Sequence, residues 1–211
     1  MKITEMSIAD AYRLVPEFHS DRRGYFSEAF RAEDLSEALG YPFVVGQGSF
    51  SMSRRNTLRG IHGTTLSPGQ TRLVTCVRGA VMDVVIDLRR GSPTFGRFEA
   101  TRLDEENQVA LCLADGMGHA FLAVTEGACM NYLLSTPYAP EAMIEINPLD
   151  PDIGVPWELT GTPIMSDKDA GAASLASAID RGILSTYEEC QAHYAALKAG
   201  SVVVRGNEKN P

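Results

Sequence analysis

The hydrophobic pattern between residues 43 and 136 is typical of β-strands. Short runs rich in Val, Ile, Leu, Thr and aromatic residues alternate with turn sequences such as SPGQ, RGSPTFG, DEEN and DGMG. The runs are TRLVTCVRG, AVMDVVIDLRRGSPTFGRFEATRL, QVALCLADGMGHAFLAV and ACMNYLLSTPY. Because they follow one another at short spacing with no long helix between them, the pattern predicts an all-β antiparallel sandwich or barrel rather than βαβ units.

Helical patterns occur only beside this β-rich region. The sequence RAEDLSEALG predicts a short helix that ends at Gly40. Near the C-terminus, STYEECQAHYAALKAG predicts a second helix, with a capping box formed by Ser185 and Glu188 and a stop at Gly200.

The chain carries no internal repeat and no low-complexity linker. We therefore predict one domain over residues 1–185, followed by a C-terminal helix and tail over residues 186–211. The last part of this tail, SVVVRGNEKNP, is predicted to be loose or to depend on a partner for its order.

The composition limits the class of protein. Of 211 residues, 44% are hydrophobic and 22% are charged, as is usual for globular proteins. The net charge of −8 disfavours a nucleic-acid partner, whose binding depends on clustered Lys and Arg. No apolar run reaches about 18 residues, and the N-terminus lacks the apolar centre of a secretion signal. We expect a cytoplasmic protein with no membrane partner.

The cysteines give no sign of a disulfide framework or a metal site. There are four, none of them in a C-x-x-C spacing: Cys76, Cys112, Cys129 and Cys190. We expect reduced and mostly buried thiols.

The segment from residue 58 to residue 77 places two polar residues in apolar surroundings. Its pattern predicts a hairpin that turns at Pro68-Gly69, with His62 on the first arm and Arg72 on the second. Diagonal neighbours on paired strands lie about 7–8 Å apart, so both side chains could reach one small ligand. Arg59 has the opposite parity to His62, and a bulge at Gly60 could turn both to one face.

Each of these residues has an ordinary structural explanation. An isolated histidine is most often hydrogen-bonded in a core or on a surface, and a strand arginine usually faces solvent. However, His119 follows a glycine-rich turn before an apolar strand, and Tyr132 stands in the middle of another. Four such residues on the strands of one barrel indicate a lined cavity.

A metal site is the first alternative for this cavity. Small β-barrel metalloenzymes commonly bind iron, manganese or zinc through an H-x-H pair, a downstream glutamate and a third histidine. Thr64 stands where the second histidine would be, and His119 is the one other plausible imidazole ligand. We therefore expect no metal ion.

Seven segments together resemble the dTDP-4-dehydrorhamnose 3,5-epimerases and their relatives in deoxysugar pathways. They are HSDRRGYFSEAF, SMSRRNTLRGIH, PGQTRLVTCVRGAVMDVVIDLRRGSPTFG, GMGHAFLAV, YLLSTPYAP, NPLDPDIGVPW and PIMSDKD, between about residues 12 and 190. The likeness is greatest to epimerases that act on modified sugars in antibiotic pathways. It implies a cupin-like jelly-roll barrel without metal or other cofactor, and a homodimer that exchanges N-terminal strands.

The resemblance also implies catalytic roles. The reaction inverts C3, C5 or both in a dTDP-4-keto-6-deoxyhexose, whose ketone can accept charge as an enolate. His62 would be the base, because imidazole titrates close to neutral pH, and Asp169 would orient it. Tyr132 would be the acid on the opposite face of the ring. Arg72 would stabilise the charge at the C4 oxygen.

Further residues are expected to bind the substrate. Arg23 and Arg59 would contact the diphosphate. The remaining expected contacts, to sugar or nucleoside, are Phe26, Glu28, Gln47, Ser49, His119 and Tyr138, of which Tyr138 would stack on thymine. For Phe26, Glu28 and Tyr138 the alternative is ordinary packing or surface placement.

At four positions the chain departs from the family pattern. Arg72 replaces a lysine, Gly63 an aromatic residue, Ser49 an asparagine and Met143 a glutamate. All four are expected near the sugar site or its approach, which suggests a smaller or modified sugar, such as a 2-deoxy or amino sugar, weakened activity or changed regiochemistry. The departures also leave two rival functions open: a non-catalytic or repurposed cupin that binds a nucleotide sugar or other keto metabolite, and a metal-dependent oxygenase.

Overall fold

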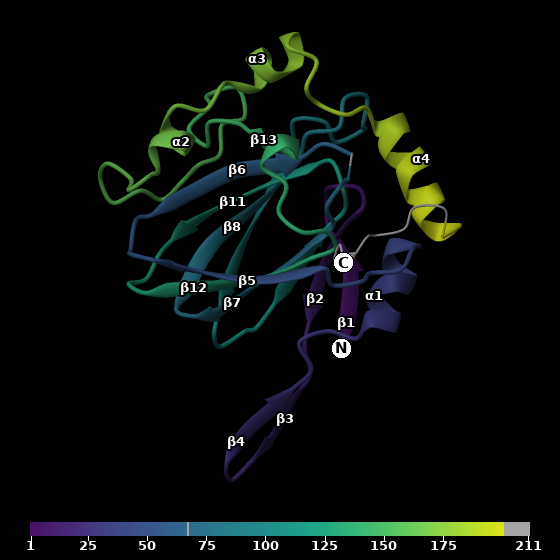
Figure 1. The fold of residues 1–211 in the computed structure, drawn as a ribbon. Coiled ribbons are helices and arrows are strands. Elements are labelled where there is room, and N and C mark those ends of the chain that lie inside the picture. Colours follow the sequence, from purple (N-terminus) through teal and green to yellow (C-terminus); the bar gives the residue numbers. More distant parts are fainter. Residues whose placement is uncertain (67, 201–211) are drawn as a thin grey trace, which may run out of the picture.

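The computed structural model describes residues 1–66 and 68–200, and it confirms the predicted jelly roll: two antiparallel sheets face each other (Figure 1). The six-stranded sheet has the order β1 (Lys2–Glu5), β2 (Ala11–Val15), β10 (Ala110–Leu113), β7 (Arg72–Arg78), β12 (Ala128–Leu134) and β5 (Gln47–Ser53). The five-stranded sheet has the order β13 (Met143–Glu145), β6 (Leu58–Thr64), β11 (Met117–Ala123), β8 (Ala80–Asp87) and β9 (Phe98–Asp104). The predicted strand runs thus become β7 to β12.

The main core lies between the two sheets. Its buried apolar side chains come from strands of both, among them Val74, Val85, Leu111, Phe121 and Met130. Burial of side chains of this size contributes roughly 1.5–3 kcal/mol each. This shared core fixes the spacing at which polar side chains on the inner faces meet.

The outer faces of the sheets are also covered. Every residue of β11 is buried, because the segment that follows β13 packs its apolar side chains, such as Ile146, Ile153 and Leu175, against the outer face of that sheet. Helix α1 packs Leu35 on the other sheet. The helices are α1 (Ala32–Leu39), the 3₁₀ turn η1 (Pro140–Ala142), α2 (Asp167–Ala170), α3 (Leu175–Asp180) and α4 (Tyr187–Lys198).

The first helix is confirmed, and the second begins one residue later than predicted. Gly40 ends α1 in the left-handed conformation, with φ 76°. The capping box of α4 is formed by Thr186 and Glu189, so the prediction of Ser185 and Glu188 is wrong. The reason is that the carbonyl of Ser185 accepts a backbone hydrogen bond from Arg90, which holds that residue in extended backbone. The predicted tail at residues 201–211 lies outside the described residues.

The predicted hairpin at residues 58–77 is wrong. Strand β6 pairs with β11 and β13, whereas β7 pairs with β10 and β12, so the two strands belong to opposite sheets. The connection after β6 therefore crosses from one sheet to the other. His62 and Arg72 face each other across the barrel instead of lying side by side, a long-range arrangement that local turn signals do not reveal.

One buried arginine joins both ends of the described chain to the barrel. Arg89, fully buried after β8, donates to Asp87 at 2.9 and 2.8 Å and to Asp10 in the N-terminal segment at 2.6 Å. Its guanidinium also lies 4.9 Å from the ring centre of Tyr187 in α4. Because a buried charge needs compensation, these contacts hold α4 and the N-terminal segment in place.

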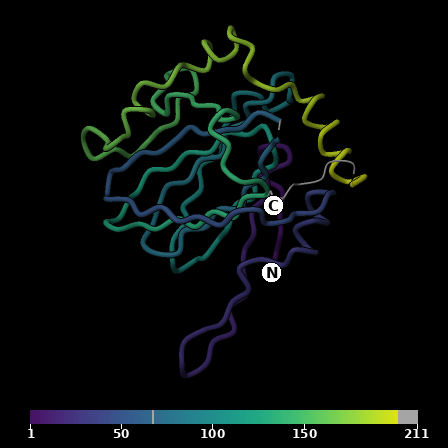
Figure 2. Tube along the Cα trace, viewed as in Figure 1, coloured from purple at the N-terminus to yellow at the C-terminus, as the bar shows by residue number. Residues whose placement is uncertain are grey.

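A third, two-stranded element projects from the barrel. Strands β3 (Phe18–Asp21) and β4 (Gly24–Ser27) form a hairpin that extends away from the two sheets (Figures 1 and 2). Phe18, Tyr25 and Phe26 are exposed on it by 38%, 52% and 66%. Such a set of exposed aromatic side chains marks an interaction surface.

Two further features concern the whole described chain. Cys76, Cys112 and Cys190 are buried and Cys129 is half-buried, all as free thiols, as predicted. Among residues 1–66 and 68–200, no helix is both long enough and apolar enough to cross a bilayer.

Candidate functional site

A cavity of about 180 Å³ lies between the two sheets of the barrel. Its lining consists of Ser51, Arg59, His62, Arg72, His119, Phe121 and Tyr132, from strands of both sheets. Five of these side chains were predicted as site residues. Four of the five are arginine or histidine side chains, from β6, β11 and the facing strand β7, so the cavity is suited to developing negative charge.

A bulge in β6 explains how Arg59 and His62 share this cavity. His119 pairs with His62 and Phe121 pairs with Arg59, so three steps along β6 match two along β11. Gly60 supplies the extra residue at φ 112°, where an added Cβ would lie 2.6 Å from the carbonyl oxygen of His119. The predicted bulge at Gly60 is confirmed, and it turns both side chains inward.

His62 is held by a carboxylate at the edge of the cavity. Its Nε2 lies 2.7 Å from Oδ1 of Asp169, which is 5% exposed at the first turn of α2. Burial by itself would raise the pKa of Asp169, but the hydrogen bonds from His62 and Ser166 and the charge of His62 lower it below its usual range. An ionised Asp169 fixes the ring and leaves Nδ1 of His62 to accept a proton.

Arg72 lies opposite, almost fully buried. Its Nη1 donates to the carbonyl oxygen of His62 at 2.7 Å, and its Nε donates to Oε1 of Gln70 at 3.0 Å. Burial lowers the pKa of Arg72 to about 10, although the charge of Asp115 opposes the shift. The guanidinium thus stays protonated at neutral pH and brings a full positive charge into the cavity.

Tyr132 contributes a phenol to the same space. Its hydroxyl lies 2.9 Å from the hydroxyl of Ser51. Burial raises the pKa of Tyr132 to about 12, with opposing effects from the hydrogen bond of Ser51 and from the charges of Arg59 and Arg72. The phenol therefore carries its proton at neutral pH and can donate it.

A second histidine–carboxylate pair lies deeper. Nε2 of His119 is 2.7 Å from Oδ2 of Asp83, and both side chains are buried. The other oxygen of Asp83 has no hydrogen-bond partner among the described residues. His119 also meets the ring of Tyr132 edge-on, at 6.2 Å between ring centres.

Other predicted contacts lie around the cavity. Arg59 donates to the hydroxyl of Ser53 at 3.1 Å and also borders a second hollow of about 330 Å³, shared with Arg54 and Ser166. Gln47 donates to Ser49 at 2.9 Å and accepts the backbone N–H of Tyr138 at 2.8 Å.

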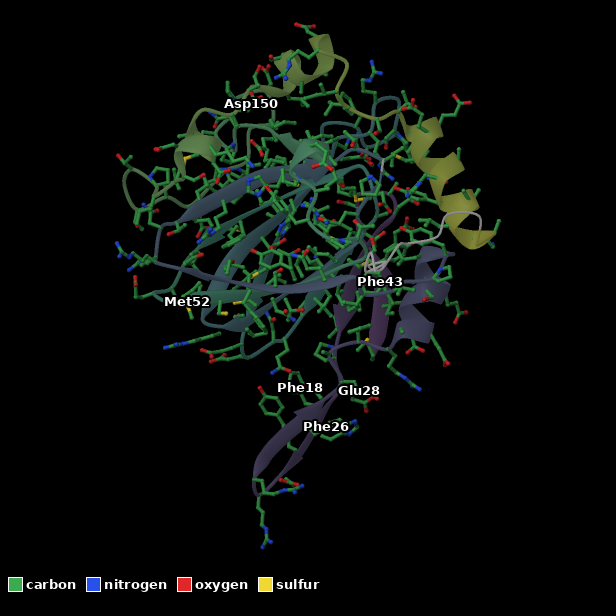
Figure 3. The ribbon with its side chains drawn as sticks, viewed as in Figure 1. Phe18, Phe26, Glu28, Phe43, Met52 and Asp150 are labelled. Atoms are coloured by element: carbon green, nitrogen blue, oxygen red, sulfur yellow. The ribbon has the colours of Figure 1, made fainter. Side chains whose placement is uncertain are left out.

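Three predicted residues lie outside the barrel. Arg23, Phe26 and Glu28 are on or directly after the projecting hairpin, and Figure 3 labels Phe26 on the hairpin and Glu28 at its base. Arg23 pairs with its neighbour Asp21 at 2.5 Å, and both are exposed. Within one chain, the predicted site is therefore divided between two regions.

One expectation about the departures from the family pattern is wrong. Gly63 lies on the outer side of β6, where an added Cβ would be 3.1 Å from the carbonyl oxygen of Met117 and close to Leu88 and Ile144. A side chain at residue 63 would thus meet the packing beneath β13 and not the cavity. Strand alternation from His62 explains this placement.

Sequence reasoning missed four residues of the site: Ser51, Gln70, Asp83 and Phe121. Two of them carried a signal. Ser51 lies between Ser49 and Ser53, at the period of two expected for one strand face, and Asp83 is an acidic residue in an apolar strand. Gln70 carried none, because it precedes β7 in an apparent turn.

Chemically, the cavity combines an oriented imidazole, a protonated phenol and a buried cation. This set can remove a proton from carbon, stabilise the resulting oxyanion and return a proton. Among the described residues, no group of three His, Cys, Asp or Glu side chains is arranged to hold a metal ion.

Comparison with known proteins agrees with this chemistry. The family pattern described as dTDP-4-dehydrorhamnose 3,5-epimerase matches residues 5–177. A dTDP-4-dehydro-6-deoxyglucose 3-epimerase from a Streptomyces species is 46% identical over 186 residues, which are 88% of this chain and 95% of that protein.

Two solved structures are similar over most of their length. The fold matches NovW, a 4-keto-6-deoxy sugar epimerase from the novobiocin gene cluster of Streptomyces spheroides, with a TM-score of 0.88, 43% identity, and coverage of 90% of this chain and 96% of NovW. It also matches ChmJ, a 3'-monoepimerase from Streptomyces bikiniensis in complex with dTDP-quinovose, with a TM-score of 0.88, 44% identity, and coverage of 92% and 98%.

Proposed function

This chain belongs to the dTDP-4-dehydrorhamnose 3,5-epimerase family, and on that basis we propose which carbon it inverts and which residues carry the reaction. It is an epimerase of a dTDP-keto-deoxysugar. We propose that the sugar is a 4-keto-6-deoxyhexose, unmodified or in a 2-deoxy or amino form, and that inversion occurs at C3. The 3-epimerases among its relatives support this choice, and the origin of NovW supports a role in antibiotic biosynthesis.

Inversion at both C3 and C5 is the second candidate. The description of the family itself favours it, because it names a 3,5-epimerase. The two reactions would use the same base and acid and differ in whether the sugar ring can turn over between two proton transfers.

The proposed chemistry begins with His62. Its free ring nitrogen removes the proton from C3, and the electrons of the C–H bond move into the ketone to give an enolate at the C4 oxygen. Arg72 stabilises that oxygen through its positive charge, and Tyr132 returns a proton to the opposite face of C3. The substrate ketone is itself the electron acceptor, so we propose that no cofactor takes part.

One observation carries this assignment. His62, held by Asp169 at 2.7 Å, lines the same cavity as the buried cation of Arg72 and the protonated phenol of Tyr132. Inversion requires a base on one face of the sugar ring, an acid on the other and a cation near the ketone oxygen. Three strands place such groups around this cavity.

We propose that the nucleotide is bound between two copies of the chain. Arg59 lines the cavity, and Gln47, which accepts the backbone N–H of Tyr138, lies on the same face of β5 as Ser51 of the lining. Arg23, Phe26 and Glu28 lie on or directly after the projecting hairpin. In a homodimer that exchanges N-terminal segments, the hairpin of one copy would reach the cavity of the other and place its aromatic side chains against the nucleotide. Residues 1–185 would form the epimerase domain, with residues 186–211 as an appendage. The cytoplasmic location stays a prediction.

Solvent exchange tests the proposal. Purified protein in heavy water is mixed with dTDP-4-keto-6-deoxyglucose, and with 2-deoxy and 3-amino analogues, and deuterium at each carbon is followed by NMR. We expect deuterium at C3 with inversion there. Deuterium at both C3 and C5 would favour the double epimerase. If no substrate exchanged, the proposed reaction would be wrong.

A further inference from the structure

The guanidinium of Arg72 is held in one orientation by two hydrogen bonds to different parts of the chain. Nη1 donates to the carbonyl of His62 in the facing sheet at 2.7 Å, and Nε donates to Oε1 of Gln70 at 3.0 Å. No described residue forms a hydrogen bond with Nη2. Because a guanidinium is planar, two bonds from different nitrogens fix both its position and its rotation, and they leave Nη2 for the cavity that Arg72 lines.

Gln70 is itself fixed. It is 6% exposed and is absent from the cavity lining, and its amide nitrogen donates to the carbonyl of Thr136 at 3.0 Å. With the amide nitrogen committed to Thr136, the amide oxygen must face Arg72. The next residue, Thr71, is anchored in turn, because its hydroxyl donates to buried Asp115 at 2.8 Å. Both polar atoms of the Gln70 amide thus have hydrogen-bond partners in one orientation, in which Oε1 accepts the hydrogen bond from Nε of Arg72.

We propose that Gln70 is a positioning residue for the epimerisation: its amide sets the rotation of the Arg72 guanidinium so that Nη2 faces the developing charge on the ketone oxygen. The inference rests on the proposed function, since it assigns Arg72 to that oxygen. Gln70 acts through Arg72 and does not touch the sugar.

The proposal makes a prediction that depends on which cation stands at residue 72. A lysine carries its charge on one nitrogen at the end of a flexible chain and has no planar group whose rotation could be set. The R72K variant should therefore no longer need Gln70 for orientation. Changing Gln70 should therefore lower the exchange rate strongly when residue 72 is arginine and weakly when it is lysine. A purely structural role of Gln70 would not produce this coupling.

The test is a double-mutant cycle on exchange at C3. Q70M keeps the length of the side chain and removes both polar atoms, and Q70N keeps the amide but shortens its reach. In the native background we expect each to lower the exchange rate at saturating substrate by roughly 10- to 100-fold, as for a small misplacement of a catalytic group. KM should change little. In the R72K background we expect a further loss below about threefold.

Two controls keep the outcomes distinct. Q191M makes the same substitution in α4, where Gln191 contacts Asp10, and should leave exchange unchanged. Urea unfolding shows whether each variant is folded. If Q70M does not fold, the exchange rate of Q70N decides the test. The positioning role would be overturned if changing Gln70 lowered the exchange rate equally in the native and R72K backgrounds, or did not lower it in the native background. In either case the epimerase assignment would stand. No exchange by the unsubstituted protein would overturn both.

Discussion

In the barrel cavity, the polar side chains are held in place by hydrogen bonds within the chain, whereas the arginine at the tip of the projecting hairpin is exposed and pairs with a neighbour in the turn. His62 is held by Asp169, and Arg72 by Gln70 and the backbone of His62. On the hairpin, Arg23 contacts Asp21, two residues away, and its side chain is 84% exposed. Nearer the barrel, Tyr25 and Ser27 of the hairpin do have a distant partner, Gln108. The contrast teaches that hydrogen bonds within one chain pre-organise the cavity, while the hairpin keeps an arginine and aromatic side chains open to solvent.

The largest expected effect comes from removing the base in the cavity. His62→Asn should lower deuterium exchange at C3 by about 10²- to 10⁴-fold, because the proposed reaction loses its base. Binding of dTDP, measured by calorimetry, should stay within a few-fold. Retained exchange would show that His62 is not the base, and the cavity would no longer be the region assigned to the proton chemistry.

Removing the acid should separate exchange from inversion. In Tyr132→Phe, His62 can still form the enolate and return a proton on its own face, but the opposite face has no donor. We expect deuterium at C3 with the original configuration retained and the inverted product reduced by about 10²-fold or more. NMR distinguishes the two epimers. Inverted product at the native rate would remove Tyr132 from the mechanism.

Changing the hairpin should affect binding more than chemistry. Arg23→Ala should raise KM by roughly tenfold, the loss of one charge-assisted contact to a phosphate, with little change in the exchange rate at saturation. Arg22→Ala, one residue away on the same turn and outside the predicted site, is the matched control. A fall in the exchange rate at saturation without a change in KM would contradict the assignment of binding to the hairpin and of chemistry to the cavity.

A mixed dimer tests whether the hairpin serves a second copy. Neither His62→Asn nor Arg23→Ala chains should form a fully competent site alone. When the two are co-expressed, a heterodimer regains one site with both residues native, and random pairing would give about a quarter of all sites. The activity is measured at substrate concentrations below KM, where the loss of Arg23 reduces the rate. There, activity of the mixture equal to the average of the two separate variants would show that each hairpin serves its own chain.

The smallest effect is expected at a helix end that touches neither region. Thr186→Ala removes the cap of α4 and should lower the free energy of unfolding by about 1 kcal/mol, measured with urea, without changing exchange. Ser185→Ala should leave stability unchanged, because Ser185 takes part through its backbone carbonyl. The reverse result would restore the capping box that the sequence suggested.

Sequence patterns predicted strands β7 to β12 and α1, because short apolar runs and turn residues are local signals. Together with the family resemblance they also gave five of the seven residues that line the cavity. They misplaced β6 and β7 in one hairpin, since the path of the connection depends on which sheet each strand joins. The resemblance to the family also put Gly63 near the sugar, although it lies beside β13 and faces away from the cavity. A local pattern shows which side chains of a strand share a face, but it does not show what packs against each face.

The partners of the site were harder to predict than the site itself. Gln70 and Asp83 hold Arg72 and His119, yet Gln70 precedes a strand in an apparent turn and Asp83 resembles any strand carboxylate. Asp83 and His119 are 36 residues apart and meet only because β8 and β11 pair. Gln70 is two residues from Arg72, but its role depends on how the chain folds before β7. The resemblance to a family supplied Arg23, Phe26 and Glu28, but nothing in the sequence showed that they would lie away from His62.

The guanidinium of Arg89 has a consequence for how the protein is made. It bonds to Asp10 near the beginning of the chain and stacks on Tyr187 near the end. During synthesis on a ribosome, Arg89 can meet Asp10 early but must wait for about a hundred further residues before α4 emerges. Arg89 therefore gains its full set of partners only after α4 has been translated, and a product truncated before α4 would leave this part of Arg89 uncovered.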